Sequence, residues 1–311
     1  MIGALKGRSL VGMSDLSNRE MEDLLALARD LKRRRQAGLV DEPLVGKTLG
    51  LVFQKPSLRT RTSFEVGMMQ LGGRSLYLSP AEVGMGQREA VDDVALVLSR
   101  YFDVLAARVF GHDLVVGLAE NATIPVINAL SDMEHPCQAL ADLMTIQEWR
   151  GSLRGLSCAF VGDGNNVAIS LGLACAKAGM HYRLAAPKGY EMPANYVQQI
   201  QREAQATGGS FMHTTDPREA ARGVNVLYTD VWTSMGQEAE REARLKAFQG
   251  YLIDEDLCRL GDDAIVLHCL PAHYGEEIAR DVTRGPRSAI WDQAENRLHA
   301  QKALLAAVVR T

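Results

Sequence analysis

Two arginines and several hydroxyl residues crowd one short segment near the start of the chain, FQKPSLRTRTSFE. An apolar, strand-like run precedes this segment, and apolar residues at helical spacing follow it. Ser57 is expected to cap that helix, which leaves the backbone N–H groups of Leu58, Arg59 and Thr60 free to face an anion. A capped helix with solvated arginines is the alternative, but two cations at a helix start oppose the helix dipole. The segment therefore predicts a phosphate site, with Arg59 as ligand and Arg61 as a brace.

A second polar group, EHPCQALAD, stands at the start of an apolar-periodic helix. Pro136 suits the first helical position, which leaves His135 at the cap. Gln138 and Asp142 then share one helix face with the imidazole, because side chains three and four positions apart are neighbours. An imidazole and a carboxamide placed together can donate to a carbonyl oxygen and bind an amide NH2. A His-Pro helix start alone is more often only a cap, so its chemistry depends on the neighbouring phosphate site.

Two further polar groups each follow a short apolar run typical of a buried strand. Asp230 ends one such run and begins the loop DVWTSMG, and Cys269 lies in HCLP after another. Ligands of open α/β sheets bind at the carboxyl ends of the strands, where both residues are expected. A lone cysteine at a strand end is usually core filler, but Cys269 is one of several polar residues at such ends.

In this order the motifs resemble the transcarbamoylase family, and its ornithine-specific branch most of all. The resemblance extends over nearly the whole chain, from Leu10 to the final helix. Five matches carry it: Ser-x-Arg-Thr-Arg at 57–61, His-Pro-x-Gln at 135–138, Asp-x-x-x-Ser-Met-Gly at 230–236, His-Cys-Leu-Pro at 268–271 and the arginine of Glu-Asn-Arg at 297. Aspartate-specific members share the first two motifs but lack the Ser-Met-Gly and His-Cys-Leu-Pro elements.

The resemblance implies transfer of the carbamoyl group of carbamoyl phosphate to the δ-amine of L-ornithine, giving L-citrulline and phosphate. Direct attack by the amine needs no covalent intermediate and no cofactor or metal. Catalytic roles are implied for Arg59, Arg108, His135 and Cys269. Carbamoyl phosphate would be bound by Ser57, Leu58, Arg59, Thr60, Arg108, His135, Gln138, Cys269, Leu270 and Arg297, and ornithine by Asn166, Asp230, Ser234 and Met235.

Two positions depart from the family pattern. Leu58 replaces the more usual threonine of the phosphate loop, which removes a hydroxyl donor but keeps a backbone N–H. Gly84 stands where many ornithine enzymes carry the glutamine that reaches a neighbouring subunit, and Gln87 or Arg88 is a possible substitute. Because the Ser-Leu-Arg-Thr-Arg sequence also occurs in acyl-ornithine transcarbamoylases, an N-acylornithine or another amine is the alternative substrate. The intact Ser-Met-Gly motif favours free ornithine.

The alternation of expected strands and helices predicts an α/β protein with two doubly wound parallel-sheet domains, and the two halves of the site are expected to face the cleft between them. The chain has 311 residues, of which 47% are hydrophobic and 23% are charged. This length exceeds that of a typical single domain, so two domains are expected. The expected division is a carbamoyl-phosphate domain at 1–150, an ornithine domain at 151–295 and a C-terminal helix at 296–311 that packs on the first domain. Strands are expected near 48–53, 74–78, 103–109 and 124–128 in the first sheet, and near 157–161, 182–185, 224–228 and 264–267 in the second.

Charge and cysteine content limit the partners. A formal net charge of −4 gives no general attraction for nucleic acid or an anionic membrane. No apolar span of membrane length and no secretory leader is evident, so we expect a cytoplasmic protein. The five cysteines are odd in number and lack metal-ligand spacing, which indicates reduced thiols. The family resemblance implies a homotrimer or a multiple of trimers.

One segment suggests a different class of enzyme. FVGDGNNV follows a strand and opens a helix, as a dinucleotide-binding fingerprint does. Val167 occupies the position of the third glycine, and no acidic residue follows at the expected distance of about 20 residues. An NAD-dependent enzyme is therefore a weak alternative. A non-catalytic paralogue that keeps the fold is a third reading, against which the intact Arg59, His135 and Cys269 argue.

Overall fold

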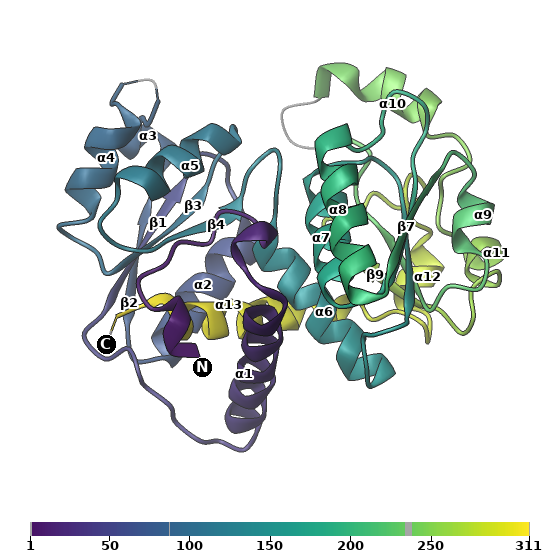
Figure 1. Ribbon diagram of the computed structural model, residues 1–311. Coiled ribbons are helices and arrows are strands. Elements are labelled where there is room, and N and C mark those ends of the chain that lie inside the picture. Colours follow the sequence, from purple (N-terminus) through teal and green to yellow (C-terminus); the bar gives the residue numbers. More distant parts are fainter. Residues whose placement is uncertain (1, 87, 234–237, 311) are drawn as a thin grey trace. The chain divides into compact units, whose positions relative to one another are not determined.

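The chain folds into two compact units, each built around its own parallel sheet (Figure 1). The computed structural model describes residues 2–86, 88–233 and 238–310. One unit consists of Met1–Met144 and Glu295–Thr311, and the other of Thr145–Ala294. Three residues singled out by the sequence, Gln87, Ser234 and Met235, lie outside the described residues. The predicted α/β class with two parallel sheets is confirmed.

The first unit contains a four-stranded parallel sheet in the order β2-β1-β3-β4. Its two central strands are buried almost throughout, as expected for strands covered on both faces. The fourth strand lies two residues further along the chain than the sequence suggested. The strands are β1 (Thr48–Phe53), β2 (Arg74–Leu78), β3 (Val104–Arg108) and β4 (Val126–Leu130).

Helices pack around this sheet, and several begin where the sequence predicts. Ser57 precedes α2 and Pro136 is the first residue of α6. The helices of the first unit are α1 (Asn18–Gln36), α2 (Leu58–Gln70), α3 (Pro80–Val83), α4 (Val91–Leu98), α5 (His112–Asn121) and the first part of α6 (Pro136–Arg150), with short 3-10 helices η1 (Ile2–Leu5) and η2 (Met13–Asp15).

The C-terminal segment packs on the first unit, in which Figure 1 also shows the N-terminus. Helix α13 (Ile290–Val308) supplies Lys302, whose Nζ donates to Gln70 Oε1 at 3.0 Å. The adjacent Gln301 donates to Ser63 Oγ at 2.9 Å. Near the chain ends, Lys6 Nζ donates to the Val309 carbonyl at 2.7 Å. Side chains from the first and last parts of the sequence therefore pack together in this unit.

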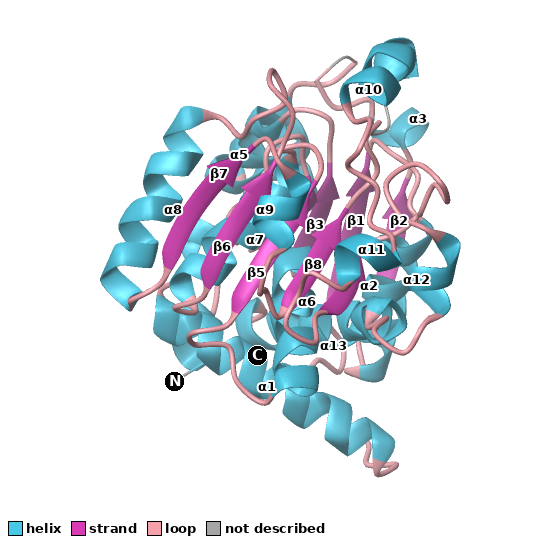
Figure 2. Cartoon of the chain, turned by 90° about the vertical axis from the view of Figure 1, so that its right-hand side faces the viewer, coloured by secondary structure: helices cyan, strands magenta, loops and turns pink. Residues whose placement is uncertain are grey.

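The second unit contains a five-stranded parallel sheet in the order β7-β6-β5-β8-β9, whose strands Figure 2 shows in magenta. The sequence did not predict the edge strand β7, because residues 210–214 are mostly exposed or half-buried and give no clear strand pattern. Its pairing with β6 makes it a strand. The strands are β5 (Ser157–Val161), β6 (His181–Ala185), β7 (Ser210–Thr214), β8 (Val226–Thr229) and β9 (Ile265–His268).

An aromatic cluster forms part of the second unit's core. Phe248 stacks on Trp232 with ring centroids 5.4 Å apart and contacts Tyr190 at 4.9 Å. No described helix in either unit is both long and apolar enough to cross a membrane. Besides the remainder of α6 and the start of α13, the helices are α7 (Asn166–Lys177), α8 (Ala194–Thr207), α9 (Pro217–Ala221), α10 (Arg241–Ala247), α11 (Glu255–Cys258), α12 (Arg280–Arg284) and the 3-10 helix η3 (Glu238–Glu240).

Candidate active site

Each sheet has one point where the strand order reverses, and several of the predicted site residues follow the strands at those points, whereas His135 and Cys269 follow the outer strands β4 and β9. In the first unit the order reverses between β1 and β3, and in the second between β5 and β8. The loops that leave the carboxyl ends of two such strands diverge to opposite faces of the sheet, which opens a crevice for a ligand. The phosphate motif follows β1, Arg108 ends β3, and Asp230 follows β8.

The phosphate loop has the predicted cap. The backbone of Ser57 is extended, and its Oγ accepts a hydrogen bond from Thr60 N at 3.2 Å. The expectation that the Thr60 N–H is free to face an anion is therefore wrong, because the cap uses it. Arg61 pairs with Glu65 Oε1 at 2.9 Å and lies 3.9 Å from the centre of the Tyr77 ring, so it is held against its own helix and β2. Within the described residues, the half-buried guanidinium of Arg59 makes neither a hydrogen bond nor an ion pair. The loop therefore has one arginine fixed in the protein and one available to a ligand.

A buried arginine from the C-terminal helix connects the two motifs of the first unit. Arg297 is 4% exposed, and its Nη1 donates to Gln138 Oε1 at 2.7 Å. Its Nη2 donates to Thr60 Oγ1 at 3.2 Å, and its Nε donates to Gln301 Oε1 at 3.0 Å. Gln138 in turn donates through Nε2 to Asp142 Oδ1 at 2.8 Å, so these two residues share a helix face as predicted. The network joins α2, α6 and α13 behind the phosphate loop.

His135 lies beside this network and is 5% exposed. Burial lowers the pKa of His135 well below its ordinary value, and the positive charges of Arg297 and Arg108 lower it further. The imidazole is therefore neutral at physiological pH, with one N–H to donate. Arg108 is half-buried at the end of β3, where the pairing with β4 shifts register between Ala107 and Arg108.

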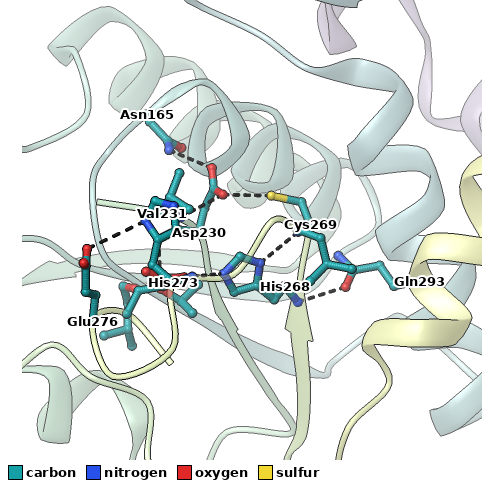
Figure 3. A network of polar contacts seen from close by, with 12 residues as sticks. Asn165, Asp230, Val231, His268, Cys269, His273, Glu276 and Gln293 are labelled. Atoms are coloured by element: carbon teal, nitrogen blue, oxygen red, sulfur yellow. Dashed lines mark hydrogen bonds and ion pairs between the residues drawn. The ribbon is translucent and has the colours of Figure 1, made fainter. Parts of the chain in front are cut away.

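The polar centre of the second unit is the carboxylate of Asp230, which is 7% exposed. Figure 3 shows this carboxylate between Asn165 and Cys269. Oδ2 accepts from Asn165 Nδ2 at 3.1 Å, and Oδ1 accepts from Cys269 Sγ at 2.9 Å and from Val231 N at 2.8 Å. Three donors thus fix the orientation of the carboxylate.

The segment that carries Cys269 is held by the buried pair His268 and Glu277. His268 Nδ1 accepts from the Leu270 backbone N–H at 2.8 Å, so the ring proton lies on Nε2, which faces Glu277 Oε1 at 3.0 Å. Leu270 has a φ of 60°, a left-handed conformation that costs a non-glycine residue about 1–3 kcal/mol. The bond from its N–H to His268 helps to hold this backbone and, with it, the direction of the Cys269 side chain (Figure 3).

The structure also shows that two neighbouring asparagines have different roles. Asn166, the residue that the family pattern indicates, is the half-buried first residue of α7. Asn165, which the sequence analysis missed, caps α7 by accepting from Val167 N and Ala168 N and also donates to Asp230. Asparagine is a favoured cap residue, so the cap could have been predicted, whereas its bond to Asp230 depends on the sheet.

The loop near Gly84 contains the possible substitutes for the missing glutamine. Gly84 ends α3 with a φ of 58°, and Arg88 directs Nη2 to the Glu82 carbonyl of the same loop. Gln54, directly after β1, joins this loop to the end of β3 by donating to Met85 O at 3.1 Å and accepting from Phe110 N at 2.9 Å. Arg88 is thus held by its own loop.

Two groups of side chains among the described residues have the composition of metal ligands. Their ligand atoms lie within 4.8 Å of one another; the groups are Asp230, His268 and Cys269, and His273, Glu276 and Glu277. In the first group both nitrogens of His268 and the thiol of Cys269 already make hydrogen bonds. In the second, Glu276 pairs with Arg241 and Glu277 accepts from His268. A metal ion would have to replace these bonds.

Comparison with known protein families covers almost the whole chain. Residues 8–148 match the family described as aspartate/ornithine carbamoyltransferase, carbamoyl-P binding domain, and residues 154–308 match aspartate/ornithine carbamoyltransferase, Asp/Orn binding domain. The first match contains the phosphate loop and the His135 helix. The second contains Asp230, Cys269 and Arg297.

Individual relatives agree over their full lengths. The chain is 52% identical over 306 residues to an ornithine carbamoyltransferase of Symbiobacterium thermophilum, covering 98% of this chain and 99% of the relative. The solved ornithine carbamoyltransferase of Pyrococcus furiosus has a TM-score of 0.96 at 48% identity, covering 98% of both chains. An anabolic ornithine carbamoyltransferase from Campylobacter jejuni has a TM-score of 0.91 at 35% identity, covering 96% of this chain and 97% of that one. The chain belongs to the aspartate/ornithine carbamoyltransferase family.

Proposed function

We propose that the chain is an ornithine carbamoyltransferase, which converts carbamoyl phosphate and L-ornithine to L-citrulline and phosphate. The observation that carries this function is the opposite charge of the two strand-order reversal points. Arg59, Arg108 and Arg297 provide positive charge in the first unit, which suits an anionic carbamoyl phosphate. The carboxylate of Asp230, next to the Cys269 thiol, provides negative charge in the second, which suits an ammonium. The names of the relatives support the same reaction.

Carbamoyl phosphate binds at the start of α2. Ser57, Arg59 and Thr60, with the backbone N–H groups of Leu58 and Arg59, hold the phosphate. This use is supported by the cap at Ser57, which bonds only the Thr60 N–H among the backbone N–H groups of 58–60, and by the absence of another partner for the Arg59 guanidinium among the described residues. As phosphate leaves, its charge increases, so these contacts strengthen along the reaction.

The carbamoyl group faces the end of β3 and the start of α6. Arg108 reaches both phosphate and carbamoyl oxygen, and the neutral His135 donates to the oxygen as it gains charge. Gln138 binds the carbamoyl NH2 through Oε1, which has a second lone pair beside the bond to Arg297. Each donor to a developing oxyanion is worth about 3 kcal/mol of barrier.

Ornithine binds in the second unit through its amino-acid end. Asp230 pairs with the α-ammonium, and Asn166, Ser234 and Met235 complete this end of the site. The three donors that orient Asp230 support the assignment, because they fix the carboxylate before the substrate arrives. Cys269 and the Leu270 carbonyl lie nearest the attacking δ-amine.

The transfer itself is a direct displacement. The δ-nitrogen attacks the carbamoyl carbon, the bond from that carbon to the phosphate oxygen breaks, and the nitrogen loses a proton. Because the free δ-amine has a pKa of about 10.4, like lysine, it must lose a proton before it attacks. The rate therefore rises with pH on the alkaline side. Cys269 assists placement or deprotonation of the amine and forms no thioester.

Each of the two substrates is assigned to one unit. We assign carbamoyl phosphate to residues 1–150 and ornithine to 151–295, with the helix at 296–311 completing the first domain through Arg297. The two domain descriptions in the family match support this assignment. No metal ion or organic cofactor takes part. None of the five cysteines, all of which are among the described residues, forms a disulfide, which supports a cytoplasmic location.

We predict that the protein assembles as a homotrimer or a multiple of trimers. Met69 on α2 and Leu76 on the edge strand β2 are 63% and 56% exposed, and such apolar exposure marks contact surfaces. Light scattering should therefore give a mass of at least three times 34.0 kDa. The double variant Met69→Glu, Leu76→Glu should reduce that mass. Gln36→Glu, which adds a charge at an exposed polar position at the end of α1, is the control. A wild-type monomer contradicts the assembly.

A substrate panel with carbamoyl phosphate held constant tests the function. Ornithine should give citrulline, while putrescine, which lacks the α-carboxylate and α-ammonium, should react at least about a hundredfold less efficiently. N-acylornithine, lysine and aspartate complete the panel. Preference for N-acylornithine would assign the alternative substrate. A folded protein that turns over none of these amines would instead be a binding paralogue.

Variants at the two charged sites should affect the kinetics of the two substrates differently. Arg59→Ala should raise the carbamoyl phosphate KM and lower kcat together, because the guanidinium meets a phosphate that gains charge. Asp230→Asn should raise the ornithine KM at least about tenfold and leave carbamoyl phosphate nearly unaffected. Steady-state kinetics with each substrate varied in turn measures both effects. Equal damage to both substrates by either variant would refute its assignment.

The buried His135 should make stability depend on pH. Its pKa is lowered in the folded chain, whereas the unfolded imidazole binds a proton below about pH 6.5. The contribution of His135 is therefore complete above pH 6.5 and is lost as pH falls, by up to about 1.4 kcal/mol per pH unit. His135→Gln should remove this part of the slope in denaturant unfolding measured from pH 7.5 to 5.5. His213→Gln, which removes an exposed imidazole, is the control. Identical slopes for wild type and His135→Gln would show that His135 titrates normally.

A further inference from the structure

One buried arginine in the second unit bonds to two separate loops. Arg244, on α10, has a side chain that is only 7% exposed. Its Nη1 donates to Asp163 Oδ2 at 2.6 Å, in the loop after β5, and to the Trp232 carbonyl at 3.0 Å, in the loop after β8. Its Nε donates to Glu240 Oε2 at 3.0 Å, but the Glu240 side chain is 59% exposed. The guanidinium thus joins the two loops that leave the strand-order reversal point.

Those two loops carry the residues that define the Asp230 site. Asp163 lies two residues before Asn165, and Trp232 lies two residues after Asp230. Asn165 and Asp230 meet at 3.1 Å across the gap between the loops. Each of the two bonds from Arg244 Nη1 therefore lies within two residues of one end of the Asn165–Asp230 contact. A change in the distance between the two loops would alter the position of the Asp230 carboxylate.

The surroundings of Arg244 explain why a guanidinium fills this position. One nitrogen, Nη1, carries two protons and serves both loops at once. The guanidinium also lies 4.9 Å from the centre of the Tyr190 ring, and the Tyr190 carbonyl accepts from Gly164 N at 2.9 Å in the same loop as Asp163. Burial raises the pKa of Asp163 although Arg244 opposes the rise, so the pair is held in a desolvated place. A buried ion pair is weak evidence for stability, because the cost of desolvation offsets its Coulombic gain.

We propose that Arg244 is a positioning residue for the ornithine site: by joining the loops after β5 and β8, it sets the geometry of the Asn165–Asp230 contact. The inference rests on the proposed function, because ornithine is the ligand assigned to Asp230. Arg244 does not touch the ligand and acts through Asp163 and the Trp232 carbonyl. Its loss should therefore affect ornithine and spare carbamoyl phosphate, which belongs to the other unit.

Two substitutions at Arg244 test this role. Arg244→Met keeps much of the side-chain volume but removes every donor, and should raise the ornithine KM about tenfold with the carbamoyl phosphate KM within about twofold of wild type. Arg244→Lys can reach both loops with one ammonium and should recover part of the loss, to about threefold. Kinetics are measured well below each variant's melting temperature, with the folded fraction determined by circular dichroism.

Matched controls distinguish positioning from general stability. Glu240→Gln disturbs only the exposed partner of Arg244 and should leave both KM values within about twofold. Asp163→Asn should raise the ornithine KM, and combining it with Arg244→Met should add little, because the two act through one contact. A lower melting temperature with unchanged ornithine KM in both Arg244 variants would overturn the proposal. Wild-type protein that does not use ornithine would instead overturn the proposed function.

Discussion

The first unit depends on the burial of one permanent positive charge. Arg297 is 4% exposed, and an arginine so placed must find acceptors for its donors, since an unpaired buried charge costs several kcal/mol. Gln138, Thr60 and Gln301 supply them. These three acceptors are neutral side chains, and the positive charge of Arg297 adds to the effect of burial in lowering the pKa of the His135 imidazole. The same charge favours the anionic ligand proposed for this unit.

The second unit pairs its buried arginine with carboxylates. Arg244 faces the carboxylate of Asp163 directly, so this pair is close to neutral. The charge that remains at the reversal point is the carboxylate of Asp230, which receives three hydrogen bonds from neutral donors. Both units therefore bury a guanidinium group close to the residues that we propose bind carbamoyl phosphate in the first unit and ornithine in the second.

The strained backbone of Leu270 lies next to the hydrogen bond between Cys269 and Asp230. Leu270 takes a φ of 60° directly after Cys269, and the buried His268 accepts its N–H. Glu277 fixes the ring proton of His268 on the opposite nitrogen, so the acceptor always faces the loop. A conformation that a leucine rarely adopts is thus maintained by two buried polar residues, and the direction of the thiol toward Asp230 follows from it.

The sequence by itself determined the local features and the family. Ser57 as a cap, Pro136 at the first helical position and most strand bounds follow from residue type and short-range spacing, which govern helix starts and buried strands. Only the tertiary structure decided which side chains meet. Arg297 lies 159 residues from Gln138, and Arg244 lies 81 residues from Asp163. The edge strand β7 likewise exists through its pairing with β6. No local pattern encodes such contacts, because they arise only when the sheet brings distant strand ends together.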